Sequence, residues 1–244
     1  DITTGTMNTI VGTLTGDALT TGSRNTAMGV SALSSEDTGS KNTAFGYASL
    51  GVLNYNGDGY NTAVGYEAGA AMTTGTENTI IGGLAGDALT TGVRNTAVGY
   101  AALSTEDAHG ANTAIGYAAL SAQNAGADAF NTAVGYQAGI AVSTGTLNTI
   151  VGGLAGDALT TGSSNTVIGQ EALTTETTGT LNVAIGREAL RYSALSNKSI
   201  GIGYAALQAQ ANSSLTDTYN VAIGHIAGSS ITTGVQNTLI GGSA

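Results

Sequence analysis

The 244-residue sequence contains no cysteine, proline or tryptophan, and only 9% of its residues are charged. The lack of cysteine excludes disulfides and thiol chemistry and leaves the redox compartment undetermined. No apolar run approaches the ~18 residues of a membrane-spanning helix, and no signal peptide is visible, so we expect no membrane insertion. The net charge of −10 would repel phosphate, which argues against nucleic-acid binding.

Signals for catalysis are also few. The chain has two histidines, His109 and His225, and neither a Gly-x-Ser-x-Gly motif nor a phosphate-binding loop. We therefore predict a protein that is not an enzyme and uses no cofactor. The alternative is a trimeric fibre that degrades polysaccharides between its chains, which would need two carboxylates facing each other across a subunit groove.

What the sequence does contain is a motif of the type Asn-Thr-Ala-Val-Gly-Tyr-x-Ala-Leu that returns about every 17 residues. A short, fixed period along a whole chain predicts a stacked, quasi-one-dimensional architecture. A unit of this length fits two short strands and two turns, so we predict an all-β parallel solenoid of about 14 coils. With its first residue numbered 0, the motif begins at Asn8, Asn25, Asn42, Asn61, Asn78, Asn95, Asn112, Asn131, Asn148, Asn165, Asn182, Ser199, Asn220 and Asn237.

Four coils make a larger unit. Successive steps of 17, 17, 19 and 17 residues sum to 70, and similar blocks start near residues 8, 78, 148 and 220. We predict one continuous repeat domain over residues 1–244. Because the chain starts and stops in the middle of a coil, we interpret it as a segment of a longer fibre, or as a subunit whose ends stack on its neighbours.

The motif also predicts which side chains point inward. Positions 1 and 3 lie on one face of a strand and positions 2 and 4 on the other. Position 3 is always large and apolar, so we expect it to point into the coil, with Ala at position 7 and Leu at position 8 forming a second apolar line.

Position 4 is Gly in every copy, although glycine weakens a strand interior. Either the backbone bends sharply there or another strand passes too close for a Cβ. We therefore predict that subunits meet along the face of positions 2 and 4. The expected contact residues are Ala63, Gly65, Ala97, Gly99, Ala114 and Gly116.

Residues 112–120 read Asn-Thr-Ala-Ile-Gly-Tyr-Ala-Ala-Leu, and residues 182–186 read Asn-Val-Ala-Ile-Gly. These segments resemble the Asn-Ser-x-Ala-Ile-Gly head repeats of trimeric autotransporter adhesins. They are closer still to the Asn-Thr-Ala-Ile-Gly-Tyr-x-Ala-Leu repeats of phage tail fibres and related surface proteins. Two departures are the longer coil and the lack, in this sequence, of a membrane anchor, a coiled-coil stalk or a chaperone domain.

The resemblance implies a left-handed β-roll in a parallel homotrimer, located outside the cell on a cell surface or virion. It also implies a structural and adhesive role, in which many weak contacts are made with a host cell-surface glycan or protein. The alternatives are a filament-forming surface protein and an ice-binding solenoid. The Thr row at position 1 suggests ice binding, but it becomes Val183, Ile200 and Val221 on consecutive coils and shares a face with position 3.

Receptor contact is expected at three lengthened turns, near 54–60, 124–130 and 212–219, because loops on a rigid scaffold often carry recognition. Each turn ends with an aromatic residue just before the motif. The alternative is that they are tolerated insertions whose aromatic side chain covers the coil edge. A calcium loop at 54–59 is disfavoured, since its twelfth position is Gly65 rather than Glu. The candidate contact residues are Tyr55, Asp58, Tyr60, Phe130 and Tyr219.

Three other rows of residues have ordinary structural interpretations. Asn at position 0 can hydrogen-bond along the stack. Tyr at position 5 could stack on sugars, but we expect it to close the coil edge or to pack between subunits with its hydroxyl in water. The acidic residues that recur in successive blocks are predicted to be solvated turn residues: Asp17, Asp87 and Asp157, with the pairs Glu36–Asp37 and Glu106–Asp107.

Overall fold

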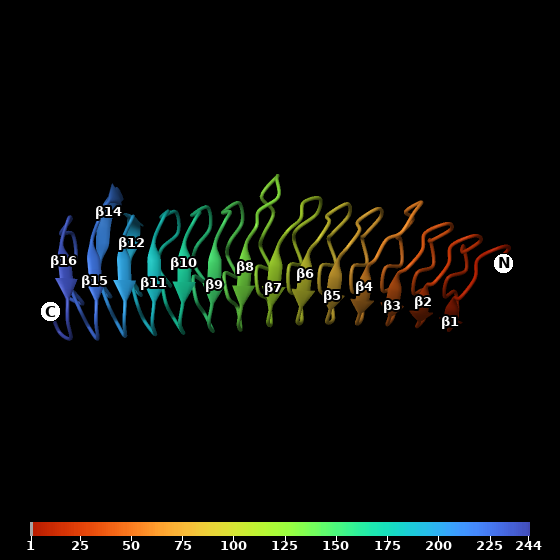
Figure 1. The fold of residues 1–244 in the computed structure, drawn as a ribbon, viewed down its shortest axis with the longest axis horizontal. Coiled ribbons are helices and arrows are strands. Elements are labelled where there is room, and N and C mark those ends of the chain that lie inside the picture. The colour runs from red at the N-terminus through yellow and green to blue at the C-terminus, as the bar shows by residue number, and fades with distance from the viewer. Residues whose placement is uncertain (1) are drawn as a thin grey trace. The chain divides into compact units, whose positions relative to one another are not determined.

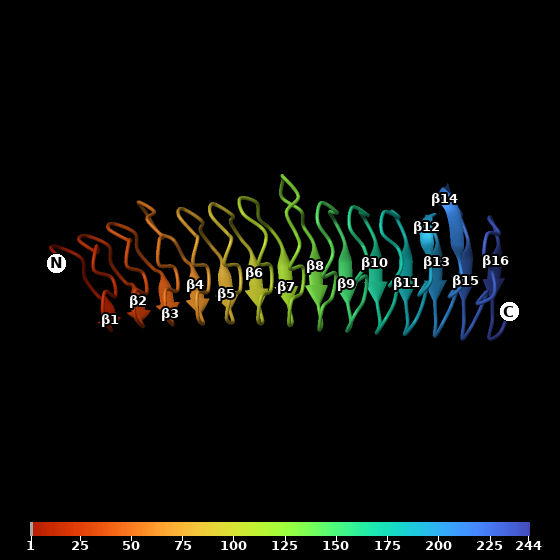
Figure 2. The ribbon, with the colours of Figure 1, turned by 180° about the vertical axis from the view of Figure 1, so that it is seen from behind.

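The computed structural model describes residues 2–244, and its regular secondary structure in that range consists of β-strands, without a helix. The chain divides into two compact units. The first holds the described residues up to Ala118 together with Gly126–Asp128, and the second holds Ala119–Ala125 with Ala129–Ala244. Within each unit, the short strands lie side by side and point the same way (Figures 1 and 2).

Each unit contributes seven strands to the main ladder. Every such strand covers motif positions 1 to 3. In the first unit they are β1 (Thr9–Val11), β2 (Thr26–Met28), β3 (Thr43–Phe45), β4 (Thr62–Val64), β5 (Thr79–Ile81), β6 (Thr96–Val98) and β7 (Thr113–Ile115). In the second unit they are β8 (Thr132–Val134), β9 (Thr149–Val151), β10 (Thr166–Ile168), β11 (Val183–Ile185), β13 (Ile200–Ile202), β15 (Val221–Ile223) and β16 (Thr238–Ile240).

Successive strands within a unit pair in parallel, and equivalent motif positions lie opposite each other. Thr96 pairs with Thr113 in the first unit, for example, and Val183 pairs with Ile200 in the second. The longer steps keep this register, since Thr43 still pairs with Thr62. The prediction of an all-β parallel solenoid of about 14 coils, with about 17 residues per coil, is therefore confirmed. Handedness and the trimer stay predictions.

The third lengthened turn is not a loop. Residues Ala211–Asp217 form strand β14, which pairs in parallel with β12 (Ala194–Asn197) across an irregular register. The extra residues therefore continue the parallel stack as a small second sheet in the second unit.

A buried asparagine joins each coil to its neighbours. The Asn148 side chain uses its Oδ1 to accept a hydrogen bond from the backbone N–H of Asn165 at 3.0 Å, and its Nδ2 donates to the Gly162 carbonyl at 2.9 Å. The same pattern links Asn8 to Asn25 and Asn78 to Asn95 in the first unit. The structural interpretation of the asparagine row is thus confirmed.

The prediction that position 3 points inward is wrong. Position 2 is the buried position, and its residues have no exposed surface at Ala27, Ala44, Ala63, Ile80, Ala97, Ala114, Ala133, Ile150, Val167, Ala184 and Ala222. The coil is narrow, and buried Leu side chains at positions 8 and 11, such as Leu103 and Leu89, fill much of its interior. Ala fits opposite them in most coils, and the coils that hold Ile80 and Ile150 at position 2 instead have Gly86 and Gly156 at position 8.

This correction bears on the predicted subunit interface. Ala63, Ala97 and Ala114 are enclosed in their own coils and offer no surface to a second chain. Gly65, Gly99 and Gly116 are half-buried. The close approach inferred at position 4 is real, but the neighbour is the next coil of the same chain: a Cβ on Gly99, where φ is +134°, would collide with the Gly116 carbonyl oxygen.

Packing between coils explains why the block contains four coils. A Cβ added to Gly69 would lie 3.1 Å from both the Leu50 and the Ile80 side chains, which come from the coils before and after it. Gly139 has the same position between Leu120 and Ile150. Over most of the chain, position 8 repeats two Leu and then two Gly in successive coils, for example Leu33, Leu50, Gly69 and Gly86, so the set of side chains that fits together spans four coils.

We predict that Gly99→Val lowers the free energy of unfolding by about 3–5 kcal/mol, because it combines a strained positive φ with a collision against the Gly116 carbonyl. Urea unfolding followed by circular dichroism measures the change. Thr90→Val is the control, since that half-exposed hydroxyl makes one hydrogen bond, to the Asp107 carbonyl at 2.7 Å, and its loss costs ~1 kcal/mol. Equal stability of Gly99→Val and the parent would contradict the close-approach explanation.

Candidate functional site

One regular surface is the outer face, which we define as positions 1 and 3 of the ladder strands. No charged residue occurs at these positions in any of the 14 copies. Position 3 is between 37% and 50% exposed at Val11, Met28, Phe45, Ile81, Ile115, Ile168 and Ile223. Each unit therefore presents a column of aliphatic side chains beside a column that consists mostly of Thr.

The tyrosines at position 5 form stacked pairs between adjacent coils. The ring centroids of Tyr47 and Tyr66 are 5.3 Å apart, with an interplanar angle of 11°. Tyr100 and Tyr117 stack at 5.6 Å. In the second unit, Tyr204 stacks with His225 at 5.2 Å. The tyrosine rings are about half exposed, so each pair offers an aromatic edge to the surroundings.

The first lengthened turn contains a small charged cluster. The Lys41 ammonium donates to Asp58 Oδ2 at 2.7 Å and to the Tyr60 hydroxyl at 2.6 Å, and it lies 4.6 Å from the centre of the Tyr60 ring. The hydrogen bond between the two side chains lowers the pKa of Asp58 and raises the pKa of Lys41. Asp58, which would be a ligand in the disfavoured calcium loop, is instead paired with Lys41.

The third lengthened turn repeats this cluster in the second unit. Lys198 contacts Asp217 at 2.5 Å and the Tyr219 hydroxyl at 3.0 Å. The hydrogen bond to Asp217, reinforced by the one to Tyr219, raises the pKa of Lys198 to about 12. The pattern that could have revealed the clusters is a Lys just before one motif and Asp-x-Tyr just before the next.

The five predicted receptor-contact residues do not form one site. Tyr60 and Tyr219 each belong to a separate Lys–Asp–Tyr cluster and are about half exposed, and Asp58 is exposed. Phe130 is 57% exposed, whereas Tyr55 is half-buried and its N–H donates to Glu36 Oε2 at 3.3 Å. Receptor contact stays a prediction at these positions.

The prediction of solvated acidic residues is wrong for one set. Glu36 and Glu106 are fully buried, as is Glu176, which recurs at the same position 70 residues later. All three occupy position 11, where Leu19, Leu53, Leu89 and Leu159 fill the core of other coils. A glutamate at an otherwise apolar position was the available signal. By contrast, Asp17 and Asp107 are exposed, and Asp87 and Asp157 are half-buried with pKa values raised by burial.

Backbone N–H groups surround two of the three buried glutamates. The Glu176 carboxylate accepts bonds from Thr177, Thr178 and Gly179 in its own turn and from Leu195 and Ser196 in the next coil. Glu36 accepts from Gly39 at 2.6 Å and from Tyr55. Burial nevertheless raises the pKa of Glu36, because these donors only partly offset the loss of hydration.

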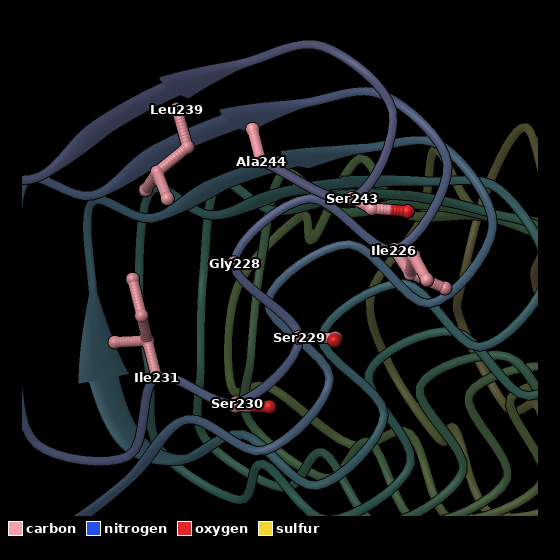
Figure 3. A pocket seen from close by; sticks show the side chains of 8 residues that line it. All are labelled: Ile226, Gly228, Ser229, Ser230, Ile231, Leu239, Ser243 and Ala244. Atoms are coloured by element: carbon pink, nitrogen blue, oxygen red, sulfur yellow. The ribbon is translucent and has the colours of Figure 1, made fainter.

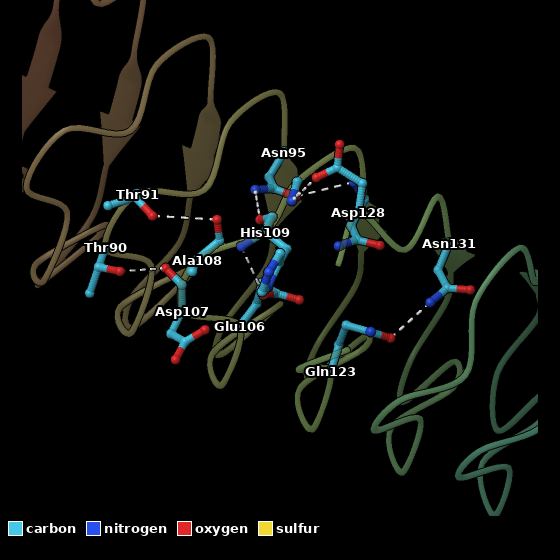
Figure 4. Close-up of polar contacts among 12 residues, drawn as sticks. Thr90, Thr91, Asn95, Glu106, Asp107, Ala108, His109, Gln123, Asp128 and Asn131 are labelled. Carbon is cyan, nitrogen blue, oxygen red and sulfur yellow. Dashed lines mark hydrogen bonds and ion pairs between the residues drawn. The ribbon is translucent and has the colours of Figure 1, made fainter. Parts of the chain in front are cut away.

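Glu106 is the exception. Its Oε1 accepts from the His109 N–H at 3.1 Å, and its Oε2 is buried without a hydrogen-bond partner. His109 Nδ1 lies 3.5 Å from Oε1 (Figure 4). Burial also raises the pKa of Glu106. Potential metal-ligand atoms of Glu106, Asp107 and His109 all lie within 4.8 Å of one another.

A hollow of about 320 Å³ occurs at the last coil, lined by Ile226, Gly228, Ser229, Ser230, Ile231, Leu239, Ser243 and Ala244 (Figure 3). Gly228, Ile231 and Leu239 occupy positions 8, 11 and 2, which form the core of the other coils. The hollow is therefore the open end of that core and not a shaped ligand pocket.

No protein family, curated protein or solved structure is significantly similar to the chain. The described residues include no helix with the length and hydropathy needed to cross a bilayer.

We predict that Glu36→Gln gains stability relative to the parent as pH rises. The pKa of Glu36 is raised in the folded state, so its contribution is fully present below the unfolded pKa and is lost as pH rises through the folded pKa. Gln does not titrate, and the chain already places Gln123 and Gln210 at position 11. The melting temperature of the variant minus that of the parent should therefore increase from about pH 4 to about pH 7.

Glu176→Gln is the matched control. The glutamine side chain has only one acceptor oxygen and would turn an NH2 group toward backbone donors. We therefore expect the free energy of unfolding to fall by about 1–3 kcal/mol at pH 7. A difference between Glu36→Gln and the parent that stays constant across this pH range would contradict the assignment.

Proposed function

We propose that the chain is a structural and adhesive fibre segment that associates with copies of itself through the outer face. It acts outside the cell, on a cell surface or virion, by multivalent contact with a host glycan or protein. The observation that carries the proposal is the outer face: an uncharged aliphatic column, about 37–50% exposed at the residues named above, that repeats once per coil in each unit. Exposed apolar surface of this extent usually marks an interface.

The size of the interaction explains why the motif is repeated. Removing the exposed half of a Val or Ile from water contributes about 1 kcal/mol. Position 3 is less exposed at Val64 and Val98, so the seven rungs of one unit contribute at most ~7 kcal/mol, which is comparable with the roughly 4–15 kcal/mol that association costs in lost motion. A few coils would contribute less than this cost, so a long run of coils is needed for stable association.

A second copy of the chain is the partner that matches this face. The side chains recur at the strand spacing of ~4.8 Å, and an identical ladder presents its own side chains with the same spacing. Closed rings bury such a face without leaving a free edge, and the resemblance to trimeric fibres favours three chains. A filament-forming surface protein would use the same face in an open arrangement.

Contact with a host would use other parts of the coil. A second chain that covers only positions 1 and 3 leaves the stacked tyrosines at position 5 and the Lys–Asp–Tyr clusters exposed. Half-exposed aromatic rings can pack against the apolar faces of sugars. Repetition of such weak contacts along the coils produces avidity without any single strong site.

We predict that the parent protein is a trimer in solution and that Ile168→Lys combined with Ile223→Lys makes it monomeric. Two buried ammonium groups per chain would cost more than the aliphatic column contributes. Light scattering coupled to size-exclusion chromatography measures the mass, and circular dichroism checks the fold. A mass that grows with concentration would favour the filament, and a monomeric parent would contradict self-association.

The control is Leu147→Lys combined with Leu181→Lys. These side chains are also more than half exposed, but they occupy position −1, where the chain itself carries Lys41, Arg94 and Lys198 with the same positive φ. The control variant should keep the mass of the parent.

The outward Thr column favours a second candidate function, ice binding. The sequence argument against it assumed that positions 1 and 3 faced the core, whereas both face outward. Under this alternative, the monomer has thermal hysteresis activity that Thr149→Lys combined with Thr166→Lys abolishes and the Leu147 and Leu181 control retains. The same face cannot be covered by a second chain and contact ice, so a trimer without hysteresis would exclude this candidate.

A further inference from the structure

One turn in the first unit differs from its two counterparts in the chain. Residues Glu106-Asp107-Ala108-His109 correspond to Glu36-Asp37-Thr38-Gly39 and to Glu176-Thr177-Thr178-Gly179. In both counterparts, the residue three positions after the buried glutamate is Gly, and a Cβ there would collide with the glutamate carboxyl group. His109 stands in this position in the middle copy.

The histidine changes how the carboxylate is satisfied. Glu36 and Glu176 bond to N–H groups of the next coil, at Tyr55 and Ser196 respectively. Glu106 keeps only the bond from the N–H of His109, and its Oε2 is buried without a hydrogen-bond partner. An unsatisfied carboxylate oxygen with no exposure is costly to the fold unless a proton or a metal cation neutralises the carboxylate.

The imidazole is placed to share a cation with Oε1, the other oxygen of the same carboxylate. His109 Nδ1 also lacks a hydrogen-bond partner and lies 3.5 Å from Glu106 Oε1. That separation is too long for a good N–H···O hydrogen bond. It is close to the ~3.3 Å that separates two ligand atoms, each about 2.0–2.1 Å from a tetrahedral zinc ion.

We propose that Glu106, Asp107 and His109 form a zinc-binding site. Glu106 is the buried anchor, and the half-buried His109 contributes Nδ1. Asp107 is exposed, so its carboxylate can turn toward the ion from the solvent side, with water completing the tetrahedron. One imidazole nitrogen with two carboxylates suits Zn²⁺ better than Ca²⁺ or Mg²⁺, which prefer oxygen ligands alone.

The surrounding turn is held independently of the ion. Asn95 Nδ2 donates to the His109 carbonyl at 3.1 Å, and Gly110 N–H donates to Asp128 Oδ1 at 2.9 Å (Figure 4). Thr90 and Thr91 of the preceding coil donate to the Asp107 carbonyl. The backbone that carries the three ligands is therefore held by the coil stack before any ion binds, which lowers the cost of ordering the site.

Calorimetric titration of the full chain with ZnCl2 at pH 7.5 tests the site. We expect one ion per chain and a melting temperature that rises with zinc concentration. Co²⁺ in place of zinc should give visible absorption bands of a tetrahedral nitrogen–oxygen site. His109→Gly restores the residue found in both counterparts, so it should fold like the parent, and it should weaken binding at least 100-fold.

His225→Gln is the matched control, because His225 is the only other histidine and stacks on Tyr204 in the second unit. Zinc bound by the parent and by His225→Gln but lost in His109→Gly supports the proposal. No zinc bound by the parent, binding retained in His109→Gly, or binding lost in His225→Gln overturns it. Circular dichroism of His109→Gly without zinc establishes that lost binding is not lost folding.

Discussion

The hydrogen bonds of the buried asparagine to the next coil are the constraint on which the structure depends. In most coils the side chain satisfies one N–H and one C=O of its neighbour, as Asn165 does for Asn182 and Gly179, whereas Asn42 satisfies only the N–H. An amide supplies the donor and the acceptor at once, and a buried backbone group left without a partner is costly. Coils are thereby locked in a register in which like residues lie on like residues. Ser199 replaces the asparagine in one coil. There the side chains of Thr218 and Gln210 hydrogen-bond to the Ser199 hydroxyl and complete the local network.

This register determines the character of every surface. Identical positions stack at one-coil spacing, so any residue type chosen for a position becomes a column. An interior column must fit its neighbours, which explains why Gly69 lies between the large side chains of Leu50 and Ile80 from the adjacent coils. An exterior column multiplies a weak property: aliphatic side chains become an apolar outer face, and tyrosines become stacked pairs. Function in such a protein follows from repetition rather than from a single cleft.

Departures from the repeat are then the places where single-site chemistry can arise. Glutamate at position 11 repeats in three blocks, and backbone donors satisfy it where a glycine follows three residues later. His109 breaks that arrangement once and leaves Glu106 without its second partner. The Lys–Asp–Tyr clusters arise in the same way, at two of the three lengthened turns. A proposed fibre surface and a proposed ion site can therefore coexist, because one uses the columns and the other uses an interruption.

The sequence by itself determined the coil length, the parallel register, the four-coil block and the role of the asparagine row, because these follow from periodicity and from the hydrogen-bonding capacity of residue types. It did not determine which strand face is inside. A period of two shows that a strand has two different faces, but it does not show which face is buried. The larger side chains at position 3 suggested the wrong face. Only the tertiary structure decided this, since Leu103 fills much of the interior of its coil and the small Ala97 is the strand residue buried with it. The tertiary structure likewise placed Glu106 in the core and revealed left-handed backbone at residues such as Lys41 and Leu147, where no glycine marks it. Those features depend on contacts between coils, which a pattern within one coil does not contain.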